Sequence, residues 1–241
     1  MDWKLRNIML IGEEASNKLQ NAHVAVVGIG GVGGFAAEGL ARAGIGLITL
    51  VDHDDIGVTN INRQVAALHS TIGQPKAEVM AARLRDIAPG ADVRSLVLRY
   101  SKDTRDEFFA ERYDYIADAI DLVAHKLDLI EQAQNRGIPV ISALGAGNKL
   151  DPELLRVGDI SKTMGCPLAR VIRKELRKRC INHHTVVWSP EEGVEPLALE
   201  TPPEGRRSVP SSMMFVPAVA GILLAQHIVV QLTINNGQWT M

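Results

Sequence analysis

Cysteine is scarce in this sequence of 241 residues, which holds only Cys166 and Cys180 and no CxxC pair. Two isolated thiols cannot form a four-cysteine zinc site, and they argue against a disulfide framework. The N-terminal stretch MDWKLRNIML also lacks the long apolar run and the small-residue cleavage site of a signal peptide. We therefore expect a protein of the reducing cytoplasm.

An excess of one charge is absent as well. Lysine and arginine number 26, aspartate and glutamate 28, and the formal net charge is −2. This balance does not indicate a nucleic-acid binder by net charge, although a local basic face stays open. Hydrophobic residues make up 46% and charged residues 22%, which is typical of a globular protein. The length suits one domain with appendages or two small domains sharing a core.

Long hydrophobic runs are limited to residues 213–234, MMFVPAVAGILLAQHIVVQLTI. The run is long enough to span a bilayer. It nevertheless contains Gln226, His227 and Gln231, and we expect its early Pro217 to shorten the helical part. We interpret it as a buried or dimer-interface helix, with a membrane span as the alternative.

Apolar runs and helical patterns alternate through the first 145 residues. The predicted strands are residues 23–28, 47–52, 92–98, 113–119 and 138–144, and the predicted helices are residues 32–43, 75–87 and 123–136. This alternation is typical of βαβ units. It predicts an α/β fold, doubly wound and Rossmann-like, with a mostly parallel sheet flanked by helices.

The pattern changes after about residue 150. We expect residues 1–150 to form the nucleotide-binding core and residues 151–241 to form a smaller C-terminal extension packed on the same domain. The extension would hold a basic helix at 167–180, a strand at 185–188, a mobile loop at 189–212 and the closing apolar helix.

The stretch VVGIGGVGG covers the end of the first predicted strand and the loop after it. It contains Gly28, Gly30, Gly31 and Gly33. Glycines between a strand and a helix let the backbone approach a phosphate, which the helix N-terminus then attracts. Asp52 ends the second strand, where a carboxylate can accept hydrogen bonds from ribose hydroxyls. These features fit any dinucleotide dehydrogenase; the alternative is that the glycines serve helix packing alone.

Charged residues farther along favour a triphosphate. The guanidinium of Arg63 can bind phosphate oxygens in bidentate fashion, and Lys76 lies in the first turn of a helix, where a cation opposes the helix dipole unless an anion is near. A solvated lysine is the alternative for Lys76. The segment ADAID ends a strand with Asp118 and Asp121; Asp118 can act as a strand cap, and we choose Asp121 as the Mg²⁺ ligand.

These motifs, in order, resemble the ATP site of the ubiquitin-activating-enzyme-like superfamily. They are GIGGVG, the D-x-D pair Asp52 and Asp54, N-x-N-R-Q at 60–64, Lys76 and a strand-end aspartate. The closest likeness is to the tRNA threonylcarbamoyladenosine dehydratase branch. It is carried by RAGIGLITLVDHDDIGVTNINRQ, DAIDLVAHKLDLI, the GAGNKLDP turn and the segment from DISKT to CPLARVIRKELRKR.

The resemblance implies roles for individual residues. Asp52 would hold the ATP ribose, with Asp54 beside it in the nucleotide site. Asn60, Arg63 and Lys76 would bind the phosphates, and Asp121 would carry Mg²⁺. Arg6 matches the arginine that reaches across a homodimer to the partner's triphosphate, so Arg6, Arg63 and Lys76 are the expected catalytic residues.

The implied reaction is ATP-dependent adenylation of the threonyl carboxylate of threonylcarbamoyladenosine in tRNA, followed by ring closure with loss of water. One alternative is adenylation of the C-terminal glycine of a ubiquitin-like sulfur carrier, against which the missing paired CxxC motifs weigh. A nicotinamide-dependent oxidoreductase and a non-catalytic ATP-binding or tRNA-binding scaffold are the others.

Two C-terminal features bear on partners. Six of the ten residues in RVIRKELRKR, 170–179, are Arg or Lys, so this helix is either a phosphate-binding face for tRNA or a solvated amphipathic helix. Cys166 precedes Pro167 and is expected at a helix N-cap, where a thiol pKa falls. That position leaves a sulfur-transfer partner open, with a buried, unreactive cysteine as the alternative.

Overall fold

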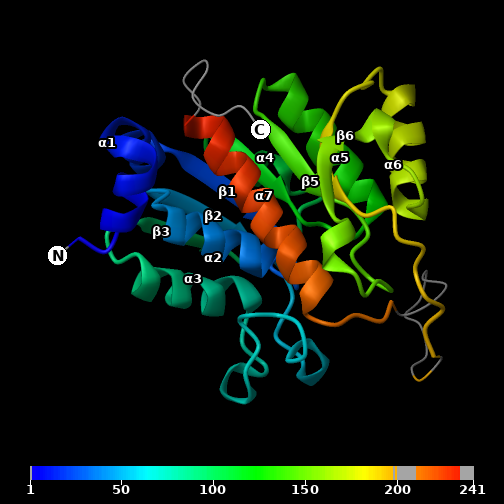
Figure 1. Ribbon diagram of the computed structural model, residues 1–241, viewed down its shortest axis with the longest axis horizontal. Helices are drawn as coiled ribbons and strands as arrows, with labels where there is room; N and C mark the ends of the chain where they lie inside the picture. Colours follow the sequence, from blue (N-terminus) through cyan, green and yellow to red (C-terminus); the bar gives the residue numbers. More distant parts are fainter. Residues whose placement is uncertain (1, 198, 200–209, 234–241) are drawn as a thin grey trace.

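Strands and helices alternate along the chain to build one seven-stranded sheet covered by helices (Figure 1). The structure is a computed structural model that describes residues 2–197, 199 and 210–233. The strands are β1 (His23–Val27), β2 (Leu47–Val51), β3 (Asp92–Leu96), β4 (Tyr115–Asp118), β5 (Val140–Ala143), β6 (Arg156–Asp159) and β7 (Thr185–Trp188). The α-helices are α1 (Leu5–Asn21), α2 (Gly33–Ala43), α3 (Lys76–Ile87), α4 (Arg105–Phe108), α5 (Val123–Asn135), α6 (Pro167–Lys178) and α7 (Phe215–Thr233). Four short 3-10 helices are η1 (Val58–Asn60), η2 (His69–Thr71), η3 (Pro152–Leu154) and η4 (Ile160–Lys162).

The strand order in the sheet is β3-β2-β1-β4-β5-β7-β6. All neighbouring strands pair in parallel except β6, which pairs antiparallel with β7. The chain moves outward from β1 through β2 to β3, and then starts again on the other side of β1 with β4. This reversal opens a crevice at the carboxyl ends of β1 and β4, where open α/β sheets bind ligands.

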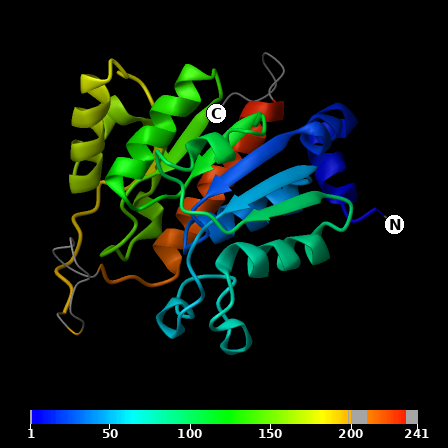
Figure 2. The same cartoon turned by 180° about the vertical axis from the view of Figure 1, so that it is seen from behind.

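Alternate side chains of β1 enter two different hydrophobic clusters. Val24 and Val26 pack with α2, α3 and α7, whereas Ala25 and Val27 pack on the opposite face with α5. Figure 1 shows α2 and α7 in front of the sheet, and Figure 2 shows α5 on its other side. Both faces of the central strand β1 are thus covered, which explains why its residues 24–27 are all apolar rather than alternating with polar ones.

The predicted fold class is therefore confirmed: the sheet is mostly parallel, doubly wound and flanked by helices. The predicted core strands and helices agree with the observed ones to within a few residues. Besides α4 and the four 3-10 helices, two elements were not predicted. Helix α1 is interrupted at Gly12, whose positive φ of 81° breaks its helical geometry, and β6 is a short, half-exposed edge strand without a strong apolar pattern.

Helix α7 packs against α2 through small residues. A Cβ atom on Gly39 would lie only 2.9 Å from the Cβ of Ala225, so glycine is needed for the close approach of the two helices. Among the described residues α7 alone is long and apolar enough to cross a membrane, with mean hydropathy 1.8. Its buried Ala220, Leu224 and Ile228 belong to the main core, so the fold itself accounts for much of this apolar character.

The expectation that Pro217 would shorten this helix is wrong. Helix α7 begins at Phe215, which puts Pro217 in the first turn. Backbone N–H groups in the first turn have no intrahelical acceptor, so proline loses no hydrogen bond there.

Asn148 joins both ends of the predicted mobile loop to the turn after β5. Its Oδ1 accepts the backbone N–H of Ser211, and its carbonyl accepts the N–H of Val194. Asn148 has a φ of 61°, a left-handed conformation that asparagine tolerates. Residues 189–197 and 210–212 are therefore tied to the sheet edge; residues 198 and 200–209 of that loop lie outside the described part.

Candidate active site

A cavity of about 440 Å³ opens at the carboxyl ends of the central strands. Its walls come from the segments that follow β1, β2, β3, β4 and β5, and from the loop carrying residues 60–64. Most of the predicted site residues line it: Gly28, Gly30, Gly31, Asp52, Asp54, Asn60, Arg63, Lys76 and Asp121. Its volume is in the usual range for a small-molecule site.

The glycine loop lies where β1 approaches the end of β4 most closely. Gly28 has a φ of 92°, and a Cβ atom there would lie 2.8 Å from the carbonyl oxygen of Ala119. Only glycine fits both the conformation and the space. Gly33, predicted as a nucleotide contact, instead begins α2 and is buried against the Gly28 carbonyl. It does not line the cavity, so its role is helix–strand packing.

Asp52 is oriented by two backbone donors. The N–H of Ile29 donates to Oδ2 at 2.6 Å, and the N–H of Asp54 donates to Oδ1 at 2.9 Å. These bonds link the glycine loop to the end of β2 and fix the carboxylate at the cavity wall. A carboxylate held in this way is preorganised to accept the hydroxyls of a ribose.

Lys76 is buried and paired with Asp54. Its side chain is 8% exposed, and Nζ lies 2.9 Å from Oδ2 of Asp54. Burial alone would raise the pKa of Asp54. The hydrogen bond and the charge of Lys76 lower it by more, so the pKa of Asp54 lies below its ordinary value. The alternative of a solvated lysine is therefore wrong: the cation is anchored at the cavity.

Arg63 and Asn60 lie in a tightly hydrogen-bonded turn. The Asn60 Oδ1 accepts the N–H of Gly57, and Arg63 Nη1 donates to the carbonyl of Thr59 at 2.8 Å. Burial lowers the pKa of Arg63, although its guanidinium stays charged at any physiological pH. The turn therefore presents a fixed cation to the cavity.

Asp118 and Asp121 have different environments. Asp121 lines the cavity and is exposed. Asp118 is fully buried, and its Oδ2 lies 2.7 Å from Nζ of the equally buried Lys126. Its Oδ1 accepts the N–H of Ile120, which ties the turn 119–122 to the end of β4. Asp118 is thus an internal partner of Lys126 and unavailable to a metal.

The buried ion pair continues into a hydrogen-bonded chain. Ser142 donates to Asp118 at 2.6 Å, so its hydroxyl oxygen must accept from Nε2 of His184, 2.7 Å away. This arrangement requires the Nε2–H tautomer of a neutral imidazole. Burial, followed by the charge of Lys126, lowers the pKa of His184 to about 3, against a smaller opposing effect of Asp159.

A second cluster of metal-binding atoms lies at the end of β2. Ligand atoms of Asp52, His53 and Asp54 fall within 4.8 Å of one another. Lys76 already bonds Asp54, and Arg99 lies 2.7 Å from Nε2 of His53. Two cations at this cluster oppose a divalent metal. Asp121 is the better candidate, because Mg²⁺ commonly takes one or two carboxylates and completes its shell with water and phosphate oxygens.

Several cavity residues were missed from the sequence. Leu98, Arg99 and Tyr100 follow β3, and His125 is in the first turn of α5. Ala146, Gly147, Pro210, Ser212 and Pro217 also line the cavity, as does Gln64. The N-x-N-R-Q motif contains Gln64, and the family-like segments DAIDLVAHKLDLI and GAGNKLDP contain His125, Ala146 and Gly147, but none of these residues was assigned to the site.

Arg6 does not reach this cavity. It is exposed on α1 and is absent from the residues that line the site. Any contact between Arg6 and a nucleotide must therefore occur in another copy of the chain.

A doubly wound sheet whose switch point opens into such a cavity defines the class: a nucleotide-binding α/β protein. Within that class the chain belongs to the ThiF family, whose model matches residues 4–238. The family resemblance predicted from the sequence is confirmed.

Several relatives of the chain are named tRNA threonylcarbamoyladenosine dehydratase. It is 44% identical over 236 residues to the tRNA threonylcarbamoyladenosine dehydratase of Bacillus subtilis (strain 168), an alignment covering 94% of this chain and 93% of the relative. It is 45% identical over 168 residues to the Escherichia coli (strain K12) protein of the same name, covering 70% of this chain and 63% of the relative. Among solved structures, E. coli TcdA in complex with ATP superposes with a TM-score of 0.85 at 36% identity, covering 94% of this chain and 92% of that one.

Proposed function

We propose that this chain is an ATP-dependent tRNA threonylcarbamoyladenosine dehydratase. The observation that carries the proposal is the convergence of Arg63, Lys76 and Asp121 on one cavity beside the glycine loop. A dinucleotide needs little beyond backbone N–H groups for its pyrophosphate. Two cations and a carboxylate suit a triphosphate with its metal. The substrate is taken from the Bacillus subtilis dehydratase, 93% of which is covered by its alignment with this chain.

The first chemical step is attack of a threonyl carboxylate oxygen on the α-phosphorus of ATP. A new O–P bond forms, the bond to the bridging oxygen breaks, and pyrophosphate leaves with the electron pair. Arg63 and Lys76 would neutralise charge on the phosphates, and Asp52 would fix the ribose. Mg²⁺, held by Asp121, would supply further charge neutralisation.

The second step is intramolecular. A nucleophilic atom of the threonylcarbamoyl group attacks the activated carbonyl carbon, and the attacking group loses a proton to solvent. The bond between that carbon and AMP breaks, AMP leaves with the electron pair, and the ring closes with net loss of water. No cysteine takes part. Cys166 caps α6 with its Sγ 3.4 Å from the N–H of Ala169 and is buried, which supports the alternative of an unreactive cysteine over a partner in sulfur transfer.

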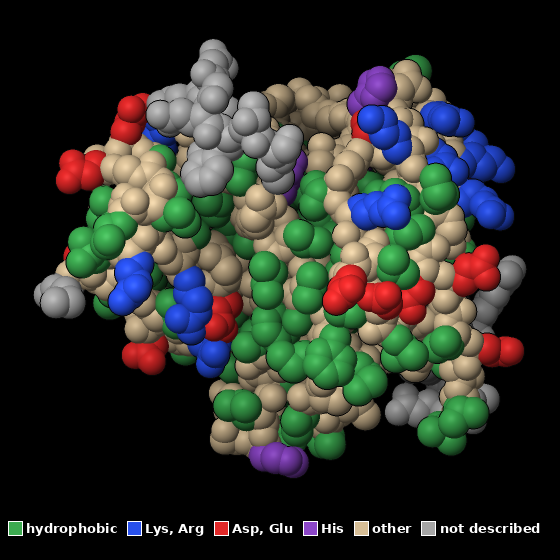
Figure 3. All heavy atoms as spheres, viewed as in Figure 1, with side chains coloured by type: hydrophobic (Ala, Val, Ile, Leu, Met, Phe, Trp, Pro, Cys, Tyr) green, Lys and Arg blue, Asp and Glu red, His purple; other side chains and the backbone are tan. Residues whose placement is uncertain are grey.

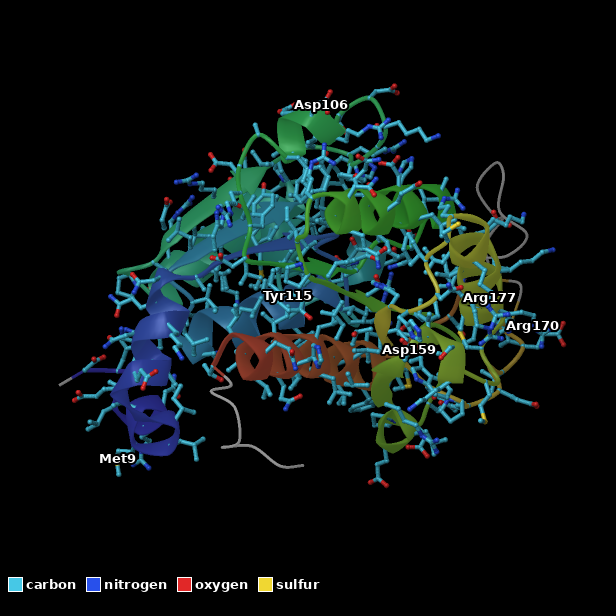
Figure 4. The ribbon with its side chains drawn as sticks, turned by 90° about the horizontal axis from the view of Figure 1, so that it is seen from above. Met9, Asp106, Tyr115, Asp159, Arg170 and Arg177 are labelled. Carbon is cyan, nitrogen blue, oxygen red and sulfur yellow. The ribbon has the colours of Figure 1, made fainter. Side chains whose placement is uncertain are left out.

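We infer that two copies of the chain form a homodimer in which Arg6 reaches the partner's cavity. Helix α1 exposes Met9 and Leu10 at 77% and 74%, and Figure 4 shows Met9 on its outer side. Phe215 and Ile222 are likewise exposed on α7. Figure 3 shows hydrophobic side chains gathered at the cavity end of α7. Exposed apolar surface of this kind is typical of protein–protein interfaces, and it therefore supports a dimer through α1 and α7.

We also propose that α6 contacts tRNA. The face opposite its buried Ile172 and Leu176 exposes Arg170, Lys174 and Arg177. These three cations follow one another at helical spacing, and Figure 4 shows Arg170 and Arg177 on the outer side of the helix. By contrast, Arg173 bonds the carbonyl of Thr163 and has a structural role. This stripe suits the regularly spaced phosphates of an RNA strand.

The test measures release of pyrophosphate and AMP from ATP, with tRNA that carries threonylcarbamoyladenosine and with the same tRNA lacking it. Release that requires the modified tRNA, with loss of one water mass from the nucleoside, is the expected result. No release with the modified tRNA, together with release in the presence of a ubiquitin-like carrier, would mean that the substrate is a protein. Silence with both would leave a non-catalytic scaffold.

A further inference from the structure

Gln64 is a buried polar residue that the reaction outlined above does not use. It is 8% exposed and lines the cavity. Its Oε1 is the one buried side-chain oxygen or nitrogen without a hydrogen-bond partner in the described part of the chain. Buried polar atoms almost always find a partner, and leaving one unpaired destabilises the fold, so a residue in this state needs an explanation.

The backbone of Gln64 is held firmly, so its position is not the result of a loose loop. Its N–H donates to the carbonyl of Asn60 at 2.9 Å, and its own carbonyl accepts the N–H of Ala67 at 3.0 Å. The side chain therefore leaves the backbone from a fixed point. It extends toward the glycine loop, where a Cβ atom on Gly30 would lie 3.9 Å from Nε2 of Gln64.

The two ends of the amide differ in accessibility. Only Oε1 is enclosed without a partner, and no hydrogen bond engages Nε2 within the described residues, so Nε2 is the end that faces the cavity. Nε2 offers two N–H donors. The second glycine of such a loop is where backbone approaches the pyrophosphate of a bound nucleotide. A neutral donor at this point therefore faces the phosphate nearest the ribose.

We propose that the Gln64 amide binds the α-phosphate of the nucleotide, the phosphorus atom at which adenylation occurs. Gln64 is then a substrate-contacting residue that donates to a non-bridging oxygen as negative charge builds up there. An apolar side chain of the same length would avoid the unpaired Oε1 but could not donate. The proposal rests on the proposed function only in taking the nucleotide to be ATP and AMP.

The variant Gln64→Met tests this role, because methionine fills similar space and has no donor. AMP affinity should fall about tenfold or more, while adenosine affinity should change by less than about twofold. The melting temperature of the ligand-free variant should rise by about 2–4 °C, since the unpaired acceptor is removed. A purely structural residue would not combine higher stability with a loss confined to the phosphate.

Gln64→Glu keeps the shape and adds a negative charge, so AMP binding should fall further than in the methionine variant. Gln134→Met is the matched control, because Gln134 is exposed on α5 away from the cavity. It should change neither AMP affinity nor melting temperature.

Unchanged AMP affinity in Gln64→Met would overturn the proposal, and so would equal losses for AMP and adenosine. These binding measurements need no tRNA. If the wild type failed to act on the modified tRNA while the AMP-specific loss appeared, the substrate would be wrong and the Gln64 contact would stand. If turnover occurred without that loss, only the Gln64 contact would fail.

Discussion

The Nζ of Lys76 lies 2.9 Å from Oδ2 of Asp54, and the Lys76 backbone N–H donates to the Asp54 carbonyl at 3.0 Å. One residue at the end of β2 thus holds both the start of α3 and its lysine. The positive charge at the first turn of α3 opposes the helix dipole. The Asp54 partner offsets that cost and keeps the cation at the cavity before any nucleotide binds.

Lys76→Met is expected to lower adenylation at least about a hundredfold, because a cation aimed at the transferring phosphates is lost. The fold should survive, because methionine keeps the buried stem and Asp54, whose side chain is 52% exposed, stays hydrated. Steady-state turnover together with the melting temperature checks both statements. Lys102→Met, a substitution at an exposed position outside the cavity, is the control. Turnover within threefold of wild type would remove Lys76 from the catalytic residues.

Asp121→Asn should lower the affinity of the site for Mg²⁺ without destabilising the fold. The amide keeps the shape but removes the negative charge that attracts a hard cation. Turnover measured against MgCl₂ concentration should shift its midpoint upward about tenfold or more. Asp106→Asn, at an exposed aspartate of α4 remote from the cavity (Figure 4), should leave the curve unchanged. An unchanged midpoint in Asp121→Asn would mean that the metal is held elsewhere.

Mixing two inactive variants tests whether Arg6 acts across the dimer. Arg6→Ala and Arg63→Ala should each be inactive alone, since each lacks one phosphate-binding cation in every site. In a mixed dimer, one site would combine the intact Arg63 of one copy with the intact Arg6 of the other. Coexpression with random pairing should restore about a quarter of wild-type activity. No restoration would show that Arg6 does not act in the partner's site.

Much of this site could be predicted from sequence because its residues directly follow strands. Gly28, Asp52 and Asp121 each end or follow an apolar run, and carboxyl ends of parallel strands meet at one edge. The signal is local, so short windows of sequence contain it. Lys76 could also be predicted from a local signal, because the adjacent Pro75 marks the start of its helix.

Interactions between distant segments could not be read in this way. The partner of Asp118 is Lys126, whose charge suggests a solvated position, yet the pair is fully buried with Ser142 and His184. The role of Gln64 is indicated only by the missing hydrogen-bond partner of its buried Oε1, which the sequence alone does not show. Gly33 was assigned to the nucleotide because a motif does not distinguish phosphate contact from helix packing.

Removing the exposed cations of α6 should weaken tRNA binding without touching the nucleotide site. In Arg170→Gln/Lys174→Gln/Arg177→Gln, the slope of log affinity against log salt should become shallower by about two to three, because three phosphate contacts are lost. ATP affinity should stay the same. A control variant loses three positive charges outside α6, at Lys18 in α1 and at Lys102 and Arg112 in loops. If both triple variants bound tRNA equally, α6 would be a solvated helix.

His184 should make the free energy of unfolding depend on pH. Its folded pKa of about 3 lies below the unfolded value of about 6.5, so the contribution is fully present above pH 6.5 and is lost as pH falls toward 3. Only the unfolded chain binds a proton there in this window, and the loss amounts to about 2 kcal/mol at pH 5. Urea unfolding of wild type and His184→Gln at pH 7 and pH 5 should reveal a smaller pH effect in the variant. His183→Gln, at the adjacent histidine whose side chain is 84% exposed, is the control and should lack this reduction. Equal pH effects in wild type and His184→Gln would mean that His184 titrates in the folded protein, and that the buried chain from Lys126 to His184 admits protons.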